Sequence, residues 1–304
     1  MMRNLRISRV LWMLRSWMGL LGIGLVCGMG LWSCRFFVPV EEYDANKRME
    51  LFPPQILREP VAVQQKARYS FVFFADIQVD DRLVAALRAP AIEVLGAYLK
   101  NNPVDFLISG GDNTQSGTSE EYGFVDREMK KLGLPIFWCA GNHDFFGDGW
   151  QLWRDYYGTT VRLLKLPHTS LYILDNATGT FGQAQRLWLE QQLKQDTATH
   201  RIAVMHFPIY GDLDYVLESH SFSREEQTFA ALFERYGVKH VLMGHSHLYR
   251  SVSINGIRYI TASALKENSP SKMILRVDVD AKEVKTTLVP IEVEGYLKWK
   301  VQLP

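Results

Sequence analysis

Residues 69–78 read YSFVFFADIQ, an apolar and aromatic run that ends at a carboxylate, Asp76, and an amide, Gln78. Further apolar runs follow it in DFLISGGD, PIFWCAGNHD, SLYILDN, RIAVMHF and HVLMGHSH. Continuous apolar runs without alternation are typical of strands that are buried on both faces. Helical patterns separate several of the runs, as in RLVAALRAPAIEVLGAYLK and QAQRLWLEQQL, which predicts crossover units.

The last part of the chain has a different pattern. After residue 248, the runs LYRSVSINGIRYITAS, KMILRVDVD and EVKTTLVPIEV are typical of strands joined by turns. The pair Asn255-Gly256 between two apolar runs is a strong hairpin signal. We therefore expect an α/β body with a mixed sheet, in which these late strands form a second packed sheet.

The N-terminal segment indicates export. Residues 1–33 hold four arginines and no acidic residue, and residues 16–34 carry no charge. As a helix that uncharged stretch would extend about 28 Å, close to the ~30 Å hydrocarbon core of a membrane. Its end, LWSC, resembles the lipobox of bacterial lipoproteins, which implies cleavage before Cys34 and a lipid anchor there. The alternative is an uncleaved N-terminal membrane helix, and either one places the body outside the cytoplasm.

The composition bounds the rest of the chain. Of the 304 residues, 47% are hydrophobic and 22% are charged, which is ordinary for a globular protein. Beyond residue 33 the chain has 30 basic and 33 acidic residues. That net charge of −3 argues against a protein that binds nucleic acid by neutralising phosphates. We expect a leader or anchor at 1–34, a proline-containing tether at 35–67, a folded domain at 68–292 and a tail at 293–304.

Polar groups at the ends of the apolar runs form the candidate site. They come from the motifs DIQ, GGDN, GNHD, MHFP and GHSH, in that order. In an open α/β sheet, ligands bind outside the carboxyl ends of the strands. We therefore expect the following side chains at one edge of the sheet: Asp76, Asp112, Asn142, His143, Asp144, His206, His245 and His247.

The donor set predicts a metal centre. Oxygen and nitrogen donors without thiolate suit Mn, Fe, Zn or Mg better than a soft metal. Two aspartates, one asparagine and three histidines besides His143 are too many for one tetrahedral site. They suit two metals about 3.5–4 Å apart that share a bridging carboxylate.

The same five motifs, in this order, resemble the calcineurin-like metallophosphoesterases over roughly residues 69–290. The resemblance implies a four-layer α/β/β/α sandwich of two mixed β-sheets flanked by helices. It also implies a binuclear metal-dependent phosphoesterase. The expected reaction is hydrolysis of a phosphomonoester, phosphodiester or nucleotide-type pyrophosphate by in-line attack of a metal-bridging hydroxide. The alternative is a surface lipoprotein that uses the fold as a non-catalytic metal- or ligand-binding module.

The resemblance also implies roles for residues. Asp112 would bridge the metals; Asp76, Gln78 and His247 would hold the first, and Asn142, His206 and His245 the second. His143 would stabilise the charge of the phosphate or protonate the leaving oxygen, and Asp144 would orient His143. Asn113, beside Asp112, and His220, in a loop between two metal-ligand strands, are candidate substrate contacts.

Gln78 departs from the Asp-x-His pattern of the family. Its amide oxygen would be a neutral metal ligand, or it would face the substrate, or the site is degenerate. Manganese-dependent ADP-ribose and CDP-alcohol diphosphatases also carry glutamine in this place, which favours catalysis on diesters or pyrophosphates. Gln115 stands where purple acid phosphatases have a tyrosine, so a purple Fe(III) centre is not expected.

A hard oxygen ligand at Gln78 shifts the metal preference toward Mn or Mg. We expect two divalent ions, Mn first, with Fe, Zn or Mg as alternatives. The expected partners are a small phosphorylated substrate and a membrane, through the N-terminal lipid or helix, and no nucleic acid. The sequence does not specify the oligomeric state.

Overall fold

The computed structural model describes residues 44–58, 63, 66–210, 224–267, 269 and 271–291. The leader at 1–34, the tail at 293–304 and His220 lie outside these described residues. Among the helices of the described part, none has the length and apolar character needed to cross a membrane.

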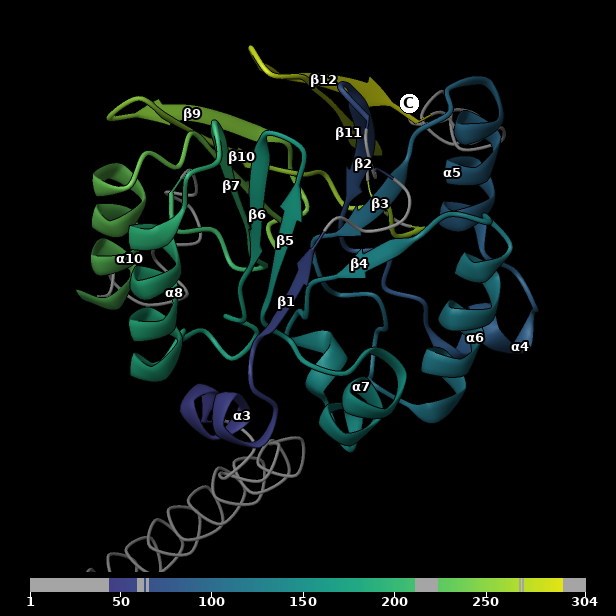
Figure 1. Cartoon of the computed structure of the whole chain (residues 1–304). Coiled ribbons are helices and arrows are strands. Elements are labelled where there is room, and N and C mark those ends of the chain that lie inside the picture. The colour runs from purple at the N-terminus through teal and green to yellow at the C-terminus, as the bar shows by residue number, and fades with distance from the viewer. Residues whose placement is uncertain are drawn as a thin grey trace, which may run out of the picture. The chain divides into compact units, whose positions relative to one another are not determined.

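Two β-sheets form the centre of the folded body (Figure 1). The seven-stranded sheet has the order β1-β5-β6-β7-β8-β10-β9, and the five-stranded sheet has the order β12-β11-β2-β3-β4. The strands of the first are β1 (Gln55–Arg58), β5 (Arg162–Leu166), β6 (Thr169–Ile173), β7 (His200–Val204), β8 (His240–Met243), β10 (Ile257–Thr261) and β9 (Arg250–Ile254). Those of the second are β12 (Val284–Pro290), β11 (Met273–Val279), β2 (Tyr69–Phe74), β3 (Phe106–Ser109) and β4 (Ile136–Trp138).

One apolar core lies between the two sheets. It joins Phe73 and Ile108 of the five-stranded sheet to Ile173 and Val204 of the seven-stranded sheet, and all four are fully buried. This core explains the uninterrupted apolar runs, because a strand with a sheet on one face and helices on the other has no solvated side. The parallel pairs β2–β3–β4 and β6–β7–β8 each bring carboxyl ends of strands together.

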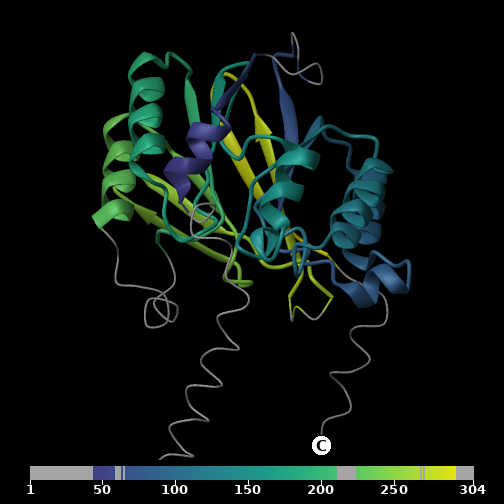
Figure 2. The same ribbon diagram turned by 90° about the horizontal axis from the view of Figure 1, so that it is seen from below.

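Helices cover the outer face of each sheet (Figure 1; Figure 2). The helices α8 (Gln183–Gln195) and α10 (Arg224–Arg235) share a core with the seven-stranded sheet. The helices α4 (Asp81–Ala85), α5 (Pro90–Asn101) and α6 (Ser119–Lys130) share one with the five-stranded sheet. The expected four-layer α/β/β/α sandwich is therefore confirmed.

The helical stretch after β2 forms two helices instead of one. The break falls just before Pro90, which begins α5. Proline suits the first turn of a helix and disfavours a helical conformation in the residue before it. The short 3₁₀ helix η3 (His143–Phe145) and the helix α7 (Gly149–Tyr157) follow β4.

The late strands do not form a sheet of their own, which corrects our expectation. The strands β9 and β10 make the predicted hairpin, with positive φ at Asn255 and Gly256, and join the seven-stranded sheet through β8. The strands β11 and β12 join the five-stranded sheet through β2. Each pair extends a sheet at a strand, β8 or β2, whose edge would otherwise stay unpaired.

The tether expected over 35–67 is also corrected for the part that the structure describes. The helix α3 (Ala45–Leu51) buries Arg48 and Met49, and β1 pairs with β5 in parallel register. A stretch with two prolines and mixed charge had no clear period, so its pairing with a strand more than 100 residues away left no local signal. The folded body therefore begins before residue 68.

Candidate metal centre

The seven predicted metal ligands lie at the carboxyl ends of five strands, drawn from both sheets. Asp76 and Gln78 follow β2, Asp112 follows β3 and Asn142 follows β4, whereas His206 follows β7, and His245 and His247 follow β8. Two groups of titratable ligand atoms result, one with His206 and His245 and one with Asp76 and His247, and Asp112 belongs to both. The structure thus brings together the residues that the sequence predicted, with Asp112 in the shared position.

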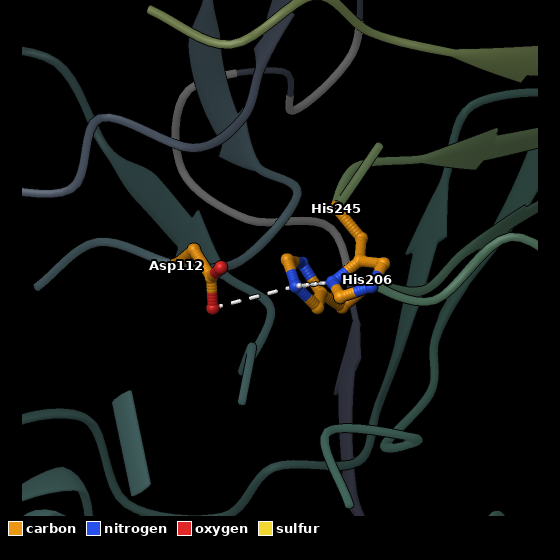
Figure 3. Close-up of side chains that lie close together, drawn as sticks. All are labelled: Asp112, His206 and His245. Carbon is orange, nitrogen blue, oxygen red and sulfur yellow. Dashed lines mark hydrogen bonds and ion pairs between the residues drawn. The ribbon is translucent and has the colours of Figure 1, made fainter. Parts of the chain in front are cut away.

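The group at the second metal site contains Asp112, His206 and His245 (Figure 3), and Asn142 lies beside it. His206 Nε2 lies 3.3 Å from Asp112 Oδ1, 3.2 Å from Asn142 Oδ1 and 3.3 Å from His245 Nδ1. Asn142 Oδ1 is 3.1 Å from His245 Nδ1. Ligands at ~2.0–2.2 Å from one ion are about 3.0–3.4 Å from one another, so these separations fit a shared cation.

The hydrogen bonding of His206 strengthens the fit. Its Nδ1 lies 2.9 Å from the carbonyl oxygen of Gly110, to which it donates, so Nε2 is the ring atom that faces the other ligands. Burial opposes protonation of this ring, but Asp112 outweighs it and raises the pKa of His206 to about 9. That nitrogen faces the Asn142 oxygen and the His245 nitrogen. Three electron-rich atoms this close repel one another unless a proton or a cation lies between them.

The group at the first metal site contains Asp76, Asp112 and His247, and Gln78 lies beside Asp112. His247 Nε2 is 3.6 Å from Asp76 Oδ1, and Gln78 Nε2 donates to Asp112 Oδ2 over 3.1 Å. Within the described residues, the buried Gln78 oxygen Oε1 has no hydrogen-bond partner. Buried polar atoms seldom stay unpaired, so a hard cation that accepts this oxygen as a ligand fits the site.

The backbone at these positions is strained. Among the described residues, positive φ occurs at five of the predicted ligands: Asp76 (54°), Gln78 (38°), Asp112 (53°), His245 (71°) and His247 (60°). Each such non-glycine residue costs roughly 1–2 kcal/mol, and such strain gathers at functional sites when the surrounding structure enforces it. The surrounding structure therefore holds the strand ends in a backbone conformation that is unfavourable for these residue types.

The GNHD loop packs so closely against Asp112 that residue 141 must be glycine. A Cβ atom there would lie 2.2 Å from Asp112 Oδ1 and 2.4 Å from the Asp112 backbone nitrogen. The GNHD loop can therefore approach the shared carboxylate only because residue 141 lacks a side chain. In return, the His143 backbone N–H donates to Asp112 Oδ1 over 2.9 Å.

The surroundings of the buried ligands shift their pKa values in different directions. Burial raises the pKa of Asp76. Burial also opposes ionisation of Asp112, but the His206 and His143 imidazoles outweigh it and hold the pKa of that carboxyl below its usual range. Burial and repulsion from His206 lower the pKa of His245 to about 3, which keeps the ring in the neutral form that binds metals.

His143 is oriented by Gln115, and the expected role of Asp144 is corrected. His143 Nδ1 lies 2.7 Å from the backbone oxygen of Gln115, to which it donates, and 3.1 Å from the Gln115 amide nitrogen. This places Nε2 toward the site, 4.0 Å from Asp112 Oδ2. Gln115 is a functional residue that sequence reasoning missed, because a backbone oxygen leaves no trace in residue type.

Asp144 instead holds the backbone of the neighbouring loop. Its carboxylate accepts hydrogen bonds from the backbone N–H groups of Asn113, Thr114 and Gly141, over 2.8–3.0 Å. It also accepts from the side chains of Asn113 and Thr114. Asp144 therefore fixes the turn that carries Asp112 against the GNHD loop, although its sequence neighbour is His143.

Asn113 is not placed to contact substrate, which corrects a second expectation. Its side chain is fully buried and forms hydrogen bonds with Ser109 and Asp144.

Asn176 is a further residue that the sequence analysis missed. Its Oδ1 accepts from the backbone N–H groups of His206 and Phe207, each over 3.0 Å. It ends the run SLYILDN, so a polar residue after a buried strand was the signal available.

Comparison with known families supports this interpretation of the site. The family model of the calcineurin-like phosphoesterases matches residues 69–249. That range holds all seven predicted metal ligands. The members of this family are binuclear metal-dependent enzymes.

Individual proteins are similar at lower identity. A protein described as a probable cyclic nucleotide phosphodiesterase of Fibrobacter succinogenes is 24% identical over 204 residues, which cover 65% of this chain and 79% of that protein. A probable glycerophosphodiester phosphodiesterase of Arcobacter nitrofigilis is 26% identical over 203 residues, with 61% and 71% covered. A dimetal phosphatase from Danio rerio shares the fold, with a TM-score of 0.58, 13% identity and 74% of this chain and 99% of that chain covered.

Proposed function

The chain belongs to the calcineurin-like phosphoesterase family and is a metal-dependent phosphoric ester hydrolase, and we propose that its substrates are small phosphodiesters or nucleotide-type pyrophosphates. The observation that carries the binuclear hydrolytic chemistry is the pair of ligand groups that share Asp112. The similar proteins from Fibrobacter succinogenes and Arcobacter nitrofigilis are described as phosphodiesterases, which supports diesters. Gln78, in place of the usual histidine, supports diesters and pyrophosphates alike.

Seven residues would bind the cations, and His143 would transfer a proton. Asp76, Gln78 and His247 would hold one divalent cation, Asn142, His206 and His245 the other, and Asp112 both. Bound cations supply Lewis acidity and lower the pKa of water toward neutrality. We propose manganese, because Gln78 would contribute an oxygen where the family pattern has an imidazole nitrogen.

His143 is the proposed proton carrier. Its Nδ1 is bound to the Gln115 carbonyl, so Nε2 is the atom that faces the substrate side. As an imidazolium it would donate from Nε2 to the leaving oxygen, or stabilise negative charge on the phosphoryl oxygens. The contact with Gln115 fixes the orientation of the ring, so Nε2 is already positioned for proton transfer.

The test is turnover by the full-length chain in detergent, after metal removal and reloading with Mn²⁺. Substrates are a nitrophenyl monoester, a bis-nitrophenyl diester, 3',5'-cyclic AMP and ADP-ribose, with Asp112→Asn as the control variant. We expect the diester and ADP-ribose to exceed the monoester in kcat/KM, and Asp112→Asn to abolish all turnover. Preference for the monoester would refute the substrate proposal. Folded protein that binds metal but turns over no substrate with Mn, Mg, Zn or Fe would indicate a binding module.

We also propose that the enzyme acts outside the cytoplasm, carried by the leader at residues 1–34. The support is the arginine-rich start, the uncharged stretch and the LWSC sequence. Mass spectrometry of the mature protein tests this. A lipidated N-terminal Cys34 supports the lipoprotein, an intact N-terminus in the membrane fraction supports the retained helix, and intact protein in the cytosol refutes both.

A further inference from the structure

Arg48 is a buried charge that lies outside the region matched by the family. It lies on α3 and is 1% exposed. The family model matches residues 69–249 and so does not include it. Arginine is seldom buried without a dedicated partner, because removing its charge from water is unfavourable. Its contacts lead to the two loops that carry Asn142 and His206.

One set of contacts leads toward His206. Arg48 Nε and Nη2 bind the two oxygens of Asp175 over 2.8 and 2.9 Å, in the two-pronged geometry that suits a guanidinium and a carboxylate. Asp175 is 2% exposed and follows β6. The next residue, Asn176, holds the backbone N–H groups of His206 and Phe207. Only one peptide unit therefore separates the residue that Arg48 holds from the residue that fixes His206.

The opposite set of contacts leads toward the GNHD loop. The Arg48 guanidinium carbon lies 5.1 Å from the ring centre of Phe145 and 5.8 Å from that of Trp150. Phe145 directly follows Asp144 in η3 and is 2% exposed. A cation at this distance from an aromatic face is attracted to it, most strongly when water is excluded.

These contacts join the two sheets. The GNHD loop follows β4 of the five-stranded sheet, and Asp175 follows β6 of the seven-stranded sheet. The second ligand group takes Asn142 from the first of these sheets and His206 and His245 from the other. Its ligand separations therefore depend on the relative position of the two sheets. The apolar core between the sheets fixes that position only loosely, because hydrophobic contacts are non-directional.

We propose that Arg48 is a positioning residue that fixes the GNHD loop relative to the His206 loop, and so sets the geometry of the second metal site. The inference rests on the proposed binuclear function. It assigns a role in the active site to α3, a segment that the family match does not include. The first metal site also takes His247 from the seven-stranded sheet, but none of its ligands lies on the GNHD loop or is held by Asn176, so it depends on Arg48 less.

The experiment compares Arg48→Lys and Arg48→Met with the wild-type full chain in detergent. Lysine keeps the charge but cannot bind both Asp175 oxygens at once, and methionine keeps only the length. The matched control is Arg201→Met, which removes the Arg201–Asp196 ion pair at the opposite end of β7. The readouts are stepwise Mn²⁺ binding by calorimetry, hydrogen exchange of the His206 and Phe207 amides in metal-free protein, and kcat and KM for the diester.

We expect Arg48→Lys to weaken the second Mn²⁺ by about tenfold or more, with a smaller effect on the first. The His206 and Phe207 amides should exchange faster, and kcat should fall more than KM changes. Arg48→Met should show the same pattern more strongly; if it does not fold, Arg48→Lys decides. Unchanged second-site affinity and unchanged exchange in Arg48→Lys would overturn the proposal, as would the same selective loss in Arg201→Met. Wild-type protein that binds fewer than two Mn²⁺ would instead contradict the binuclear function, and the exchange data would still test Arg48.

Discussion

Replacing Asp144 by asparagine tests the most specific correction that the structure makes. The Asp144 Oδ1 atom accepts from the backbone N–H groups of Asn113 and Thr114, and Oδ2 accepts from the Gly141 N–H and the Asn113 amide. Asparagine keeps one acceptor oxygen and replaces the other with a donor. Two donors, one of them the Gly141 backbone N–H, then face an NH₂ group and lose their partner.

The magnitude follows from those two bonds. A hydrogen bond to a charged group contributes about 1.5–3 kcal/mol, so two of them contribute about 3–6 kcal/mol. Part of this loss is offset. Burial and repulsion from Asp112 raise the pKa of Asp144 to about 6, so its charge is unfavourable there, and asparagine removes that charge. We expect a net loss of about 3 kcal/mol in the free energy of unfolding.

The assay is urea unfolding of metal-free protein, followed by Mn²⁺ titration. The control is Asp196→Asn, which disrupts a buried aspartate bonded to Ser170 and Tyr172 on β6, away from the metal ligands. Asp144→Asn should lower both stability and Mn²⁺ affinity, because its loop carries Asp112, whereas Asp196→Asn should lower stability alone. If Asp144→Asn keeps wild-type stability and changes only the pH dependence of turnover, Asp144 orients His143 after all.

The remaining predictions concern single side chains. His143→Asn should lower kcat by about 10²–10⁴-fold with Mn²⁺ affinity unchanged, and a parallel loss of metal would instead make His143 a ligand. Gln78→Leu should weaken one Mn²⁺ site by about tenfold, because it removes the unpaired Oε1; unaltered binding with a raised KM would place Gln78 at the substrate. Glu121 is tested by pH: burial raises its pKa from 4.5 to about 7, so its stabilising effect is present below pH 4.5 and is lost as the pH rises through 7. Glu121→Gln should remove that loss, which reaches about 3 kcal/mol by pH 8 at ~1.4 kcal/mol per pKa unit, and identical pH profiles of urea unfolding would contradict it.

The metal ligands were predictable because of where they stand in the sequence. Asp112, His206 and His245 each follow a short apolar run, and a buried strand rarely ends on such groups unless they share a ligand. The strand ends could be read without knowing which strands pair. The predicted seven ligands therefore appear together, although the sequence analysis placed the late strands in the wrong sheet.

The supporting residues were not predictable in this way. Arg48 and its partner Asp175 lie 127 positions apart, and Arg48 stands in a stretch without a clear apolar period, so no local pattern pairs them. Gln115 acts mainly through its backbone oxygen, and Asp144 turns toward Asn113 and Gly141 instead of its neighbour His143. Sequence adjacency suggested the opposite for Asp144, because the direction of a side chain depends on the turn in which it stands.

The sequence by itself therefore determined the fold class, the donor atoms and the strand ends that carry them. These depend on local properties: the period of apolar residues, and the residue types that follow each run. Only the tertiary structure decided how closely the groups meet across the two sheets and which residues hold the loops in place. Those outcomes depend on contacts between segments far apart along the chain, whose geometry is set by how the sheets and helices come together and not by any one segment.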